Sequence, residues 1–345
     1  MAEPLFSVVI ACYNHETFIR DAVESALRQQ HPSMEVIAVD DASKDKTTEI
    51  LASFGDSIIL ERLPVNGGAG TARNHGASVA KGKYLVFLDG DDALTPWSLS
   101  MYGRIVAERS PAIILGRCSL FYGDLPTNMA IPPPEAQFVE YANFLDKDRN
   151  WVYNTSSLVV ERAAFHEAGG FSPEIFCHDN QDLLNKLCVK QKTILVLAPY
   201  TVLYRMHGTN TIHQVGRFIE GIRVLQRKAR QGAYPGGRAV WMKRSAWFGG
   251  LTFYWAKEGM RNGLLYDGLR LMITSWWMIF LAVIRRALAL ITGRKPVEVL
   301  TFEPNGSESP RDLHSVHPLA GSLPGDYEMA GCENLSARGH RGEKA

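Results

Sequence analysis

Four short apolar runs alternate with helical patterns at the N-terminal end of this 345-residue chain. Each run has the length of a buried strand rather than of a helix, and residues 6–11 are rich in β-branched residues. The runs are residues 6–11, 35–39, 57–63 and 84–88, and the helical patterns are residues 16–29, 46–54 and 67–80. Strands joined through helices by short connections predict an α/β fold, with a mostly parallel, twisted sheet and helices on both faces.

The pattern changes twice further along the chain. Strand-like segments return at residues 112–122 and 193–204, so the α/β domain is expected to cover residues 1–212. Residues 213–297 are predicted to form a helical, basic region. Residues 298–345 are rich in Gly, Pro, Ser, Glu and His, and this composition predicts a disordered tail.

The helical region combines an apolar stretch with an excess of bases. Residues 271–284 carry no charge, but these 14 residues are fewer than the ~20 that a membrane-spanning helix needs. The stretch therefore predicts a core or oligomer-contact helix, or else a helix at a membrane surface. From Arg270 to Lys295 there are five bases and no acid, which favours an anionic neighbour such as a phospholipid surface or a lipid phosphate. The oligomeric state is not predicted.

Charge and cysteine content narrow the function classes. The net charge of +1 gives no argument for a nucleic-acid partner. The five cysteines form neither a metal-ligand pair nor a disulfide framework, which is typical of reduced thiols in the cytosol. The N-terminus has no basic region or cleavage site of a signal peptide. We therefore expect a cytoplasmic protein, either free or bound peripherally at the cytoplasmic face of a membrane.

Polar residues follow the predicted strands where ligands bind in open parallel sheets, at the carboxyl ends. Ala11, Tyr13 and Asn14 follow the first strand and can line a nucleotide pocket. Asp41 follows the second strand, where its carboxylate can accept a hydrogen bond from a base or a ribose. Arg73 lies in the helix after the glycine-rich segment and can supply a fixed positive charge.

The fourth strand ends in Asp89-Gly90-Asp91-Asp92. Two carboxylates this close are costly unless a cation neutralises them, and oxygen ligands suit Mg²⁺ or Mn²⁺ bound to a diphosphate. Alone, however, an Asp-x-Asp pattern is also common in acidic surface turns. Two other nucleotide motifs are missing: no Lys-Ser/Thr follows Gly67–Gly70, and Asn14-His15 stands where a dinucleotide fold needs glycine.

Several motifs in order resemble glycosyltransferase family 2, which has the GT-A fold. They are Ser7–Asn14, Val39–Ser43 with Asp45 and Thr47, Asn66-x-Gly68 with Ala72–Asn74, and Phe87–Asp92. The resemblance implies a metal-dependent, inverting transfer of a sugar from a nucleotide-diphosphate sugar to an acceptor hydroxyl. The acceptor would be a cell-envelope polysaccharide or a lipid-linked saccharide.

The resemblance also implies roles for single residues. Asp41 corresponds to the acid at the nucleotide base, and Arg73 to the arginine at the nucleotide. Asp89 would lie near the ribose or the metal, and Asp91 would hold the metal, Mn²⁺ or Mg²⁺. His207, in the segment Tyr204–His207, is either a further metal ligand or phosphate donor, or a structural histidine.

The general base is the point at which the chain departs from the family. The family presents Glu-Asp at the start of a helix, whereas this chain has His178-Asp179-Asn180-Gln181-Asp182. One register makes Asp182 the base, and another points to Asp179. We place Asp182 first and Asp179 second. Both acids could instead serve only the N-terminal turn of a helix.

Two other functions remain open. A nucleotidyltransferase would carry a glycine-rich, basic segment after the first strand, and Cys12–His15 is not one. The altered Glu-Asp segment would also fit a non-catalytic scaffold that binds a nucleotide-sugar.

Overall fold

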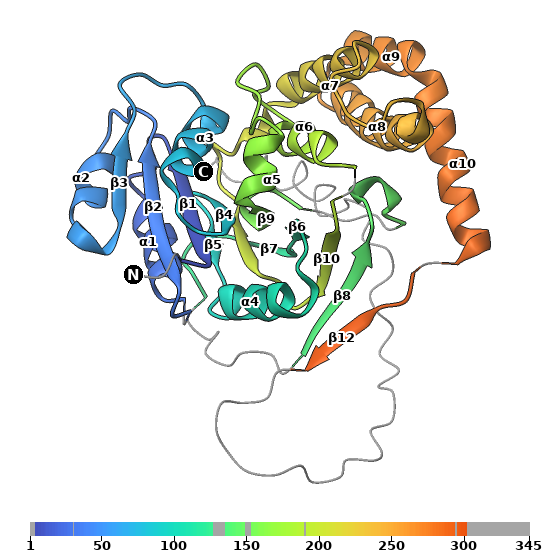
Figure 1. Cartoon of the computed structure of the whole chain (residues 1–345). Coiled ribbons are helices and arrows are strands. Elements are labelled where there is room, and N and C mark those ends of the chain that lie inside the picture. The colour runs from blue at the N-terminus through green and yellow to red at the C-terminus, as the bar shows by residue number, and fades with distance from the viewer. Residues whose placement is uncertain are drawn as a thin grey trace, which may run out of the picture.

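The computed structural model describes residues 4–29, 31–126, 135–148, 153–189, 191–293 and 295–301. Within these residues the central sheet has nine strands in the order β12-β8-β10-β6-β9-β4-β1-β2-β3 (Figure 1). The strands are β1 (Phe6–Cys12), β2 (Met34–Asp40), β3 (Ile59–Arg62), β4 (Tyr84–Asp89), β6 (Ile113–Leu115), β8 (Glu135–Tyr141), β9 (Leu158–Glu161), β10 (Thr193–Ala198) and β12 (Glu298–Thr301). A small second sheet contains β5 (Ala93–Leu94), β11 (Val202–Arg205) and β7 (Cys118–Phe121).

The predicted α/β architecture is confirmed, and it is most regular in the N-terminal half. β3, β2, β1 and β4 are all parallel neighbours. The other half of the sheet is mixed, because β9 runs antiparallel to both β4 and β6, and β8 runs antiparallel to β10. The predicted strand at residues 193–204 is two strands in different sheets, β10 and β11.

Helices cover both faces of the sheet, as the alternation predicted. Val8 and Ile10 of β1 enter a core with α1 (Ile19–Leu27) and α4 (Ser98–Arg109), whereas Val9 and Ala11 enter a second core. The second core also contains α3 (Ala69–Val79), α5 (Arg162–Glu167) and α6 (Asp179–Lys186). The short helix α2 (Thr47–Ala52) connects β2 to β3. Gly76 allows α3 to approach the sheet closely, because a Cβ there would lie 2.4 Å from Cγ1 of Val9.

Four helices follow the sheet domain: α7 (Val215–Arg230), α8 (Gly237–Arg261), α9 (Leu265–Thr274) and α10 (Trp276–Thr292). They pack beside α6 at one side of the sheet (Figure 1). The uncharged stretch at residues 271–284 crosses the break between α9 and α10, and it is neither wholly buried nor wholly exposed. No single described helix has both the length and the apolar composition to cross a membrane. Residues 265–274 and 276–289 reach both together, but with a bend of 72° between them.

The start of the predicted tail is ordered. Glu298–Thr301 form β12, which pairs antiparallel with β8, and Leu300 is buried. Arg109 of α4 forms an ion pair with Glu298 at 2.7 Å. The prediction of disorder therefore fails for these four residues, whose partners lie far away in sequence. The rest of the predicted tail, residues 302–345, lies outside the described residues.

Candidate functional site

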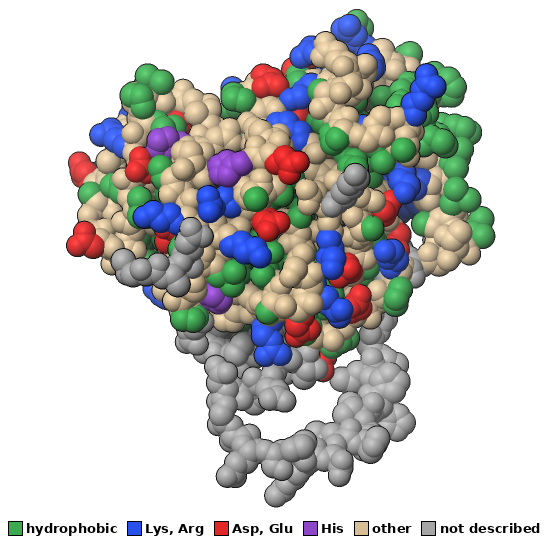
Figure 2. Space-filling model, in the orientation of Figure 1, with side chains coloured by type: hydrophobic (Ala, Val, Ile, Leu, Met, Phe, Trp, Pro, Cys, Tyr) green, Lys and Arg blue, Asp and Glu red, His purple; other side chains and the backbone are tan. Residues whose placement is uncertain are grey.

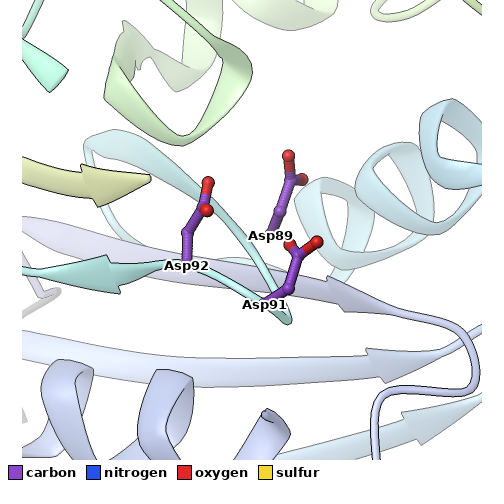
Figure 3. Close-up of side chains that lie close together, drawn as sticks. All are labelled: Asp89, Asp91 and Asp92. Carbon is purple, nitrogen blue, oxygen red and sulfur yellow. The ribbon is translucent and has the colours of Figure 1, made fainter. Parts of the chain in front are cut away.

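Three carboxylates gather where β4 ends. Asp89, Asp91 and Asp92 each offer an oxygen within 4.8 Å of the others (Figure 3). The turn depends on Gly90, because a Cβ there would lie 2.6 Å from Nδ1 of His15 and 2.7 Å from Cβ of Cys12. Only glycine therefore brings the acidic turn this close to the end of β1.

Asp92 anchors this turn to neighbouring segments of the protein. Its buried carboxylate accepts hydrogen bonds from Oγ of Ser156 at 2.5 Å, Nδ2 of Asn154 at 3.1 Å and the backbone N–H of Arg205 at 3.1 Å. Burial, together with the neighbouring aspartates, raises the pKa of Asp92 well above its ordinary value. Because its oxygens are engaged with the protein, Asp92 serves the shape of the turn.

Asp91 and His207 come together from 116 positions apart. Nε2 of His207 lies 3.0 Å from Oδ2 of Asp91. The other ring nitrogen of His207, Nδ1, lies 2.8 Å from Oγ1 of Thr209. Burial opposes ionisation of Asp91, but the contact with His207 and the nearby His15 outweigh it, so the pKa of Asp91 is lowered. Phe18 packs on the His207 ring. An ionised carboxylate beside a ring nitrogen, with Asp89 next to them, is a donor set that fits a divalent cation without fixing which one.

Arg73 joins the acidic turn to helix α6. Its buried guanidinium donates to Asp89 at 2.5 Å and also to Asp179, and the two opposite charges raise the pKa of Arg73 against the effect of burial. Nε of Arg73 has no hydrogen-bond partner among the described residues. The guanidinium also lies over the Phe171 ring. Arg73 therefore lies at the predicted site, where it links the two carboxylates that flank it.

The two candidate bases have different surroundings. Asp182 is buried and accepts from Oγ of Ser172 at 2.6 Å and Oη of Tyr234 at 2.7 Å. Lys186 and Lys228 add ion pairs at 3.0 and 3.1 Å. Burial opposes ionisation of Asp182, but these partners outweigh it and hold its pKa below the ordinary value. No oxygen of Asp182 is left for a substrate proton.

Asp179 is the acid that faces the acidic turn. Its side chain is 13% exposed, and Arg73 bridges it to Asp89. Burial raises the pKa of Asp179 despite the charge of Arg73. Asp182, which the sequence placed first, is thus enclosed by protein partners, whereas Asp179 faces the acidic turn. Lys228 and Tyr234, the partners that decide this, belong to the helical region, about 50 residues from the motif, so a local pattern could not include them.

The predicted nucleotide residues lie along the ends of β1 and β2. Both oxygens of Asp41 accept backbone hydrogen bonds, from Gly67 at 2.8 Å and Gly68 at 2.7 Å, so Asp41 holds the glycine-rich loop in place. Asn14 has a left-handed backbone and accepts from the backbone N–H of Lys44. The side chain of Ala11 is in the core, and its backbone O accepts from the N–H of Gly90 at 3.0 Å. Tyr13 is 37% exposed.

Two residues without a predicted role belong to the same place. Nδ1 of His15 is buried without a hydrogen-bond partner in the described part of the chain, next to Gly90. The buried Arg205 donates to the backbone O of Asp91 at 3.1 Å and to Oδ2 of Asp21 at 2.6 Å. The sequence could have indicated both residues, because His15 directly follows Asn14 and Arg205 lies in the segment Tyr204–His207.

The sequence model of the family described as glycosyl transferase family 2 matches residues 7–169. Residues 7–169 are a family 2 glycosyltransferase domain. The match covers the acidic turn, Arg73 and Asp41, and it gives no support to the nucleotidyltransferase alternative. Helix α6, with Asp179 and Asp182, lies outside the matched residues.

Individual relatives agree with this assignment. The putative teichuronic acid biosynthesis glycosyltransferase TuaG of Bacillus subtilis is 34% identical over 164 residues, which are 46% of this chain and 63% of TuaG. An uncharacterised glycosyltransferase of Haemophilus influenzae is 38% identical over 165 residues, 47% of this chain and 64% of that protein. The chain therefore spans just under two thirds of the length of these relatives.

A solved structure shows the fold. Residues 1–349 of S. aureus TarS, crystallised in complex with UDP-GlcNAc, superpose with a TM-score of 0.61 at 18% identity. The superposition covers 78% of this chain and 79% of the TarS chain. The expected GT-A fold is thus confirmed, with the helical region following it.

Proposed function

We propose that the protein transfers a sugar from a nucleotide-diphosphate sugar to an acceptor hydroxyl, with inversion at the anomeric carbon. One observation carries the proposal: Arg73 connects the acidic turn at Asp89 to a second carboxylate, Asp179, at the carboxyl end of β4. A diphosphate leaving group needs positive charge on one side, and an acceptor hydroxyl needs a base on the other.

Asp89, Asp91 and His207 are the residues that would hold a divalent cation, Mn²⁺ or Mg²⁺. When bound, such an ion neutralises negative charge that develops on the departing diphosphate. The chain's own part is to keep these groups in place. Gly90 sets the turn, Asp92 anchors it, and Phe18 supports the imidazole.

The nucleotide would lie along the ends of β1 and β2. Asp41 shapes this wall by holding the glycine-rich loop, and its remaining lone pairs can accept from a base N–H. The half-exposed ring of Tyr13 offers an apolar surface next to it. Asn14 completes the wall, and Ala11 supports it from the end of β1.

Asp179 is our choice for the general base. Burial raises the pKa of this carboxyl, and a carboxylate with a raised pKa is a stronger proton acceptor. Arg73 fixes the orientation of Asp179 relative to Asp89. In the proposed reaction Asp179 takes the proton of the acceptor hydroxyl as its oxygen attacks the anomeric carbon, and the nucleoside diphosphate leaves from the opposite side.

The relatives suggest the class of acceptor. TuaG is described as acting in teichuronic acid biosynthesis, and a relative from Bacillus spizizenii is a poly(ribitol-phosphate) beta-glucosyltransferase, 33% identical over 117 residues. That alignment covers 32% of this chain and 18% of the relative. We accordingly propose an acceptor in a cell-envelope polysaccharide or its lipid-linked precursor. Synthesis from nucleotide-sugars would place the protein in the cytoplasm or at the cytoplasmic face of the membrane.

The test begins with a donor screen. The full chain is heated with UDP-, GDP- and dTDP-sugars, with Mn²⁺, with Mg²⁺ or with EDTA, because a donor at 100 times its Kd stabilises the folded state by about 2.7 kcal/mol. The best donor is then incubated with teichoic- and teichuronic-type oligosaccharides, and products are identified by mass spectrometry and their anomeric configuration by NMR. Metal-dependent binding without transfer across the panel would instead indicate a nucleotide-sugar-binding scaffold.

A further inference from the structure

Helices α9 and α10 carry a continuous apolar surface that no described part of the protein covers. The large apolar side chains on it recur every three or four residues, which is the spacing of one helix face. They are Leu265, Tyr266, Leu269, Ile273, Trp276, Phe280, Val283, Ile284, Leu288 and Ile291, and each is between 38% and 81% exposed. We call this set the apolar face. Figure 2 shows hydrophobic side chains gathered at the edge of the molecule where these helices lie.

A surface of this kind differs from ordinary exposed apolar residues. Single apolar side chains are scattered over any protein, but a contiguous apolar patch marks an interaction site. The apolar face follows α10 from Trp276 to Ile291, which is nearly the whole helix. The occupant must therefore cover an extended strip about 25 Å long at a helical rise of about 1.5 Å per residue.

The opposite side of α10 is fixed to the protein. Met278 is buried, and a Cβ on Gly249 of α8 would lie 1.9 Å from its backbone O, so the two helix backbones touch. Arg285 donates to the backbone O of Leu145 at 2.6 Å and of Lys147 at 2.5 Å. Helix α10 thus lies flat with one side free. A helix held in this way fits an interface between water and an apolar phase, whereas a span would have to withdraw Arg285 from these carbonyls.

The charges around the apolar face select the occupant. Residues 265–297 contain five bases and one acid, Asp267, which already pairs with Arg223 at 2.7 Å, and Arg270 and Arg286 are exposed on the same two helices. A second copy of the chain placed face to face would bring arginines against arginines without an acid to pair them. An anionic phospholipid surface offers phosphates to the bases and acyl chains to the apolar face, and Trp276 is of the type that prefers this boundary.

We propose that the apolar face inserts into one leaflet of an anionic phospholipid bilayer, with α9 and α10 lying in the plane of the interface. This binding does not depend on the proposed transferase activity, because none of its residues belongs to the site at β4. The interaction combines burial of apolar side chains with attraction of Arg270 and Arg286 to lipid headgroups, so it weakens with salt.

The test is flotation of the full chain with vesicles of phosphatidylcholine containing 30% phosphatidylglycerol, a composition on the order of the anionic content that recruits basic segments. The variant Trp276→Glu/Phe280→Glu/Ile284→Glu places three acids on the apolar face. Val65→Glu is the control, since it changes an equally exposed apolar residue in the loop after β3, on the other side of the molecule (Figure 1). Circular dichroism and thermal unfolding show whether each variant is folded.

We expect wild type and Val65→Glu to float with these vesicles, and the triple variant to lose binding more than tenfold while it remains folded. Binding should fall with added salt and on pure phosphatidylcholine. Wild type that stays in solution, or a folded triple variant that floats like wild type, would overturn the proposal. So would self-association of wild type that the triple variant abolishes in the absence of vesicle binding, because the occupant would then be a second copy. Extraction from membranes by detergent but not by salt and alkali would show a span instead.

Discussion

Substitution of Asp179 and of Asp182 by asparagine should separate turnover from stability. Asp182→Asn removes the charge that pairs Lys186 at 3.0 Å and Lys228 at 3.1 Å, and it presents an amide N–H₂ to groups that already donate. Breaking a buried pair costs about 3–5 kcal/mol. The lysine side chains keep 16% and 15% of their exposure and can partly rehydrate, so we expect the lower end, about 3 kcal/mol.

The same change should leave the chemistry nearly intact. A loss of about 3 kcal/mol lowers Tm by roughly 4–6 °C in a protein of this size, and this is measured by calorimetry. At a temperature where the variant is folded, kcat of Asp182→Asn should stay within about threefold of wild type. Asp179→Asn should behave in the opposite way. Its kcat falls about 10³-fold, equivalent to about 4 kcal/mol, whereas its stability falls less than that of Asp182→Asn, because Asp89 still pairs with Arg73.

Tyr234→Phe is the matched control, because it removes only the hydroxyl that donates to Asp182. A hydrogen bond to a charged group contributes about 1.5–3 kcal/mol, so this variant should be less stable than wild type with an unchanged pH–rate profile. If folded Asp182→Asn loses turnover while Asp179→Asn keeps it, the assignment of the base is wrong and the sequence register that favours Asp182 is right.

The pH dependence of stability follows from the lowered pKa of Asp182. A carboxyl whose pKa is lower in the folded state stabilises that state above its unfolded pKa of about 3.9, and the contribution disappears as the pH falls through the folded value. The difference in unfolding free energy between wild type and Asp182→Asn should therefore be full at neutral pH and shrink below about pH 4. A difference that stays constant between pH 7 and pH 3 would contradict the ion-pair account.

Three further outcomes are expected. Asp91→Ala should abolish metal-dependent nucleotide binding in calorimetry with UDP and Mn²⁺, and unchanged affinity would refute the cation assignment. Gly76→Ala should destabilise the protein by about 1–3 kcal/mol in denaturant unfolding, because its Cβ would overlap Val9, and a neutral effect would mean that α3 can move outward. Truncation after Thr301 should leave stability and turnover unchanged. Truncation after residue 297 also removes β12 and should lower Tm. Equal Tm values for the two truncations would show that β12 contributes nothing to stability.

The sequence predicted the elements whose formation depends on residues close together in the chain. The alternation of strands and helices up to Asp89 follows from residues close in sequence, and the strands at β1, β2 and β4 lie where the apolar runs predicted them. β12 could not be predicted in this way. Its four residues become a strand only because β8, some 160 positions earlier, offers a free edge.

The residues of the candidate site also fall into a group that the sequence predicted and a group that it did not. The acidic turn, Asp41 and Arg73 were predicted because their motifs occur in the expected order. The link from Arg73 to Asp179 spans 106 positions, and no spacing rule contains it. The burial of Asp182 depends on Tyr234, which the sequence offered only as one of many aromatic residues in a helical region.

The packing of the helical region against α6 has a practical consequence for the design of chimeric proteins from this chain. His178 packs edge-on against the stacked rings of Phe218 and Trp255, and a Cβ on Gly221 would lie 2.7 Å from the backbone O of Cys177. The helix that carries Asp179 is thus shaped by side chains that come after residue 212. A fusion joint placed after residue 212 would separate α6, which carries the proposed base, from the side chains that pack against it, so an exchangeable segment has to extend through α8.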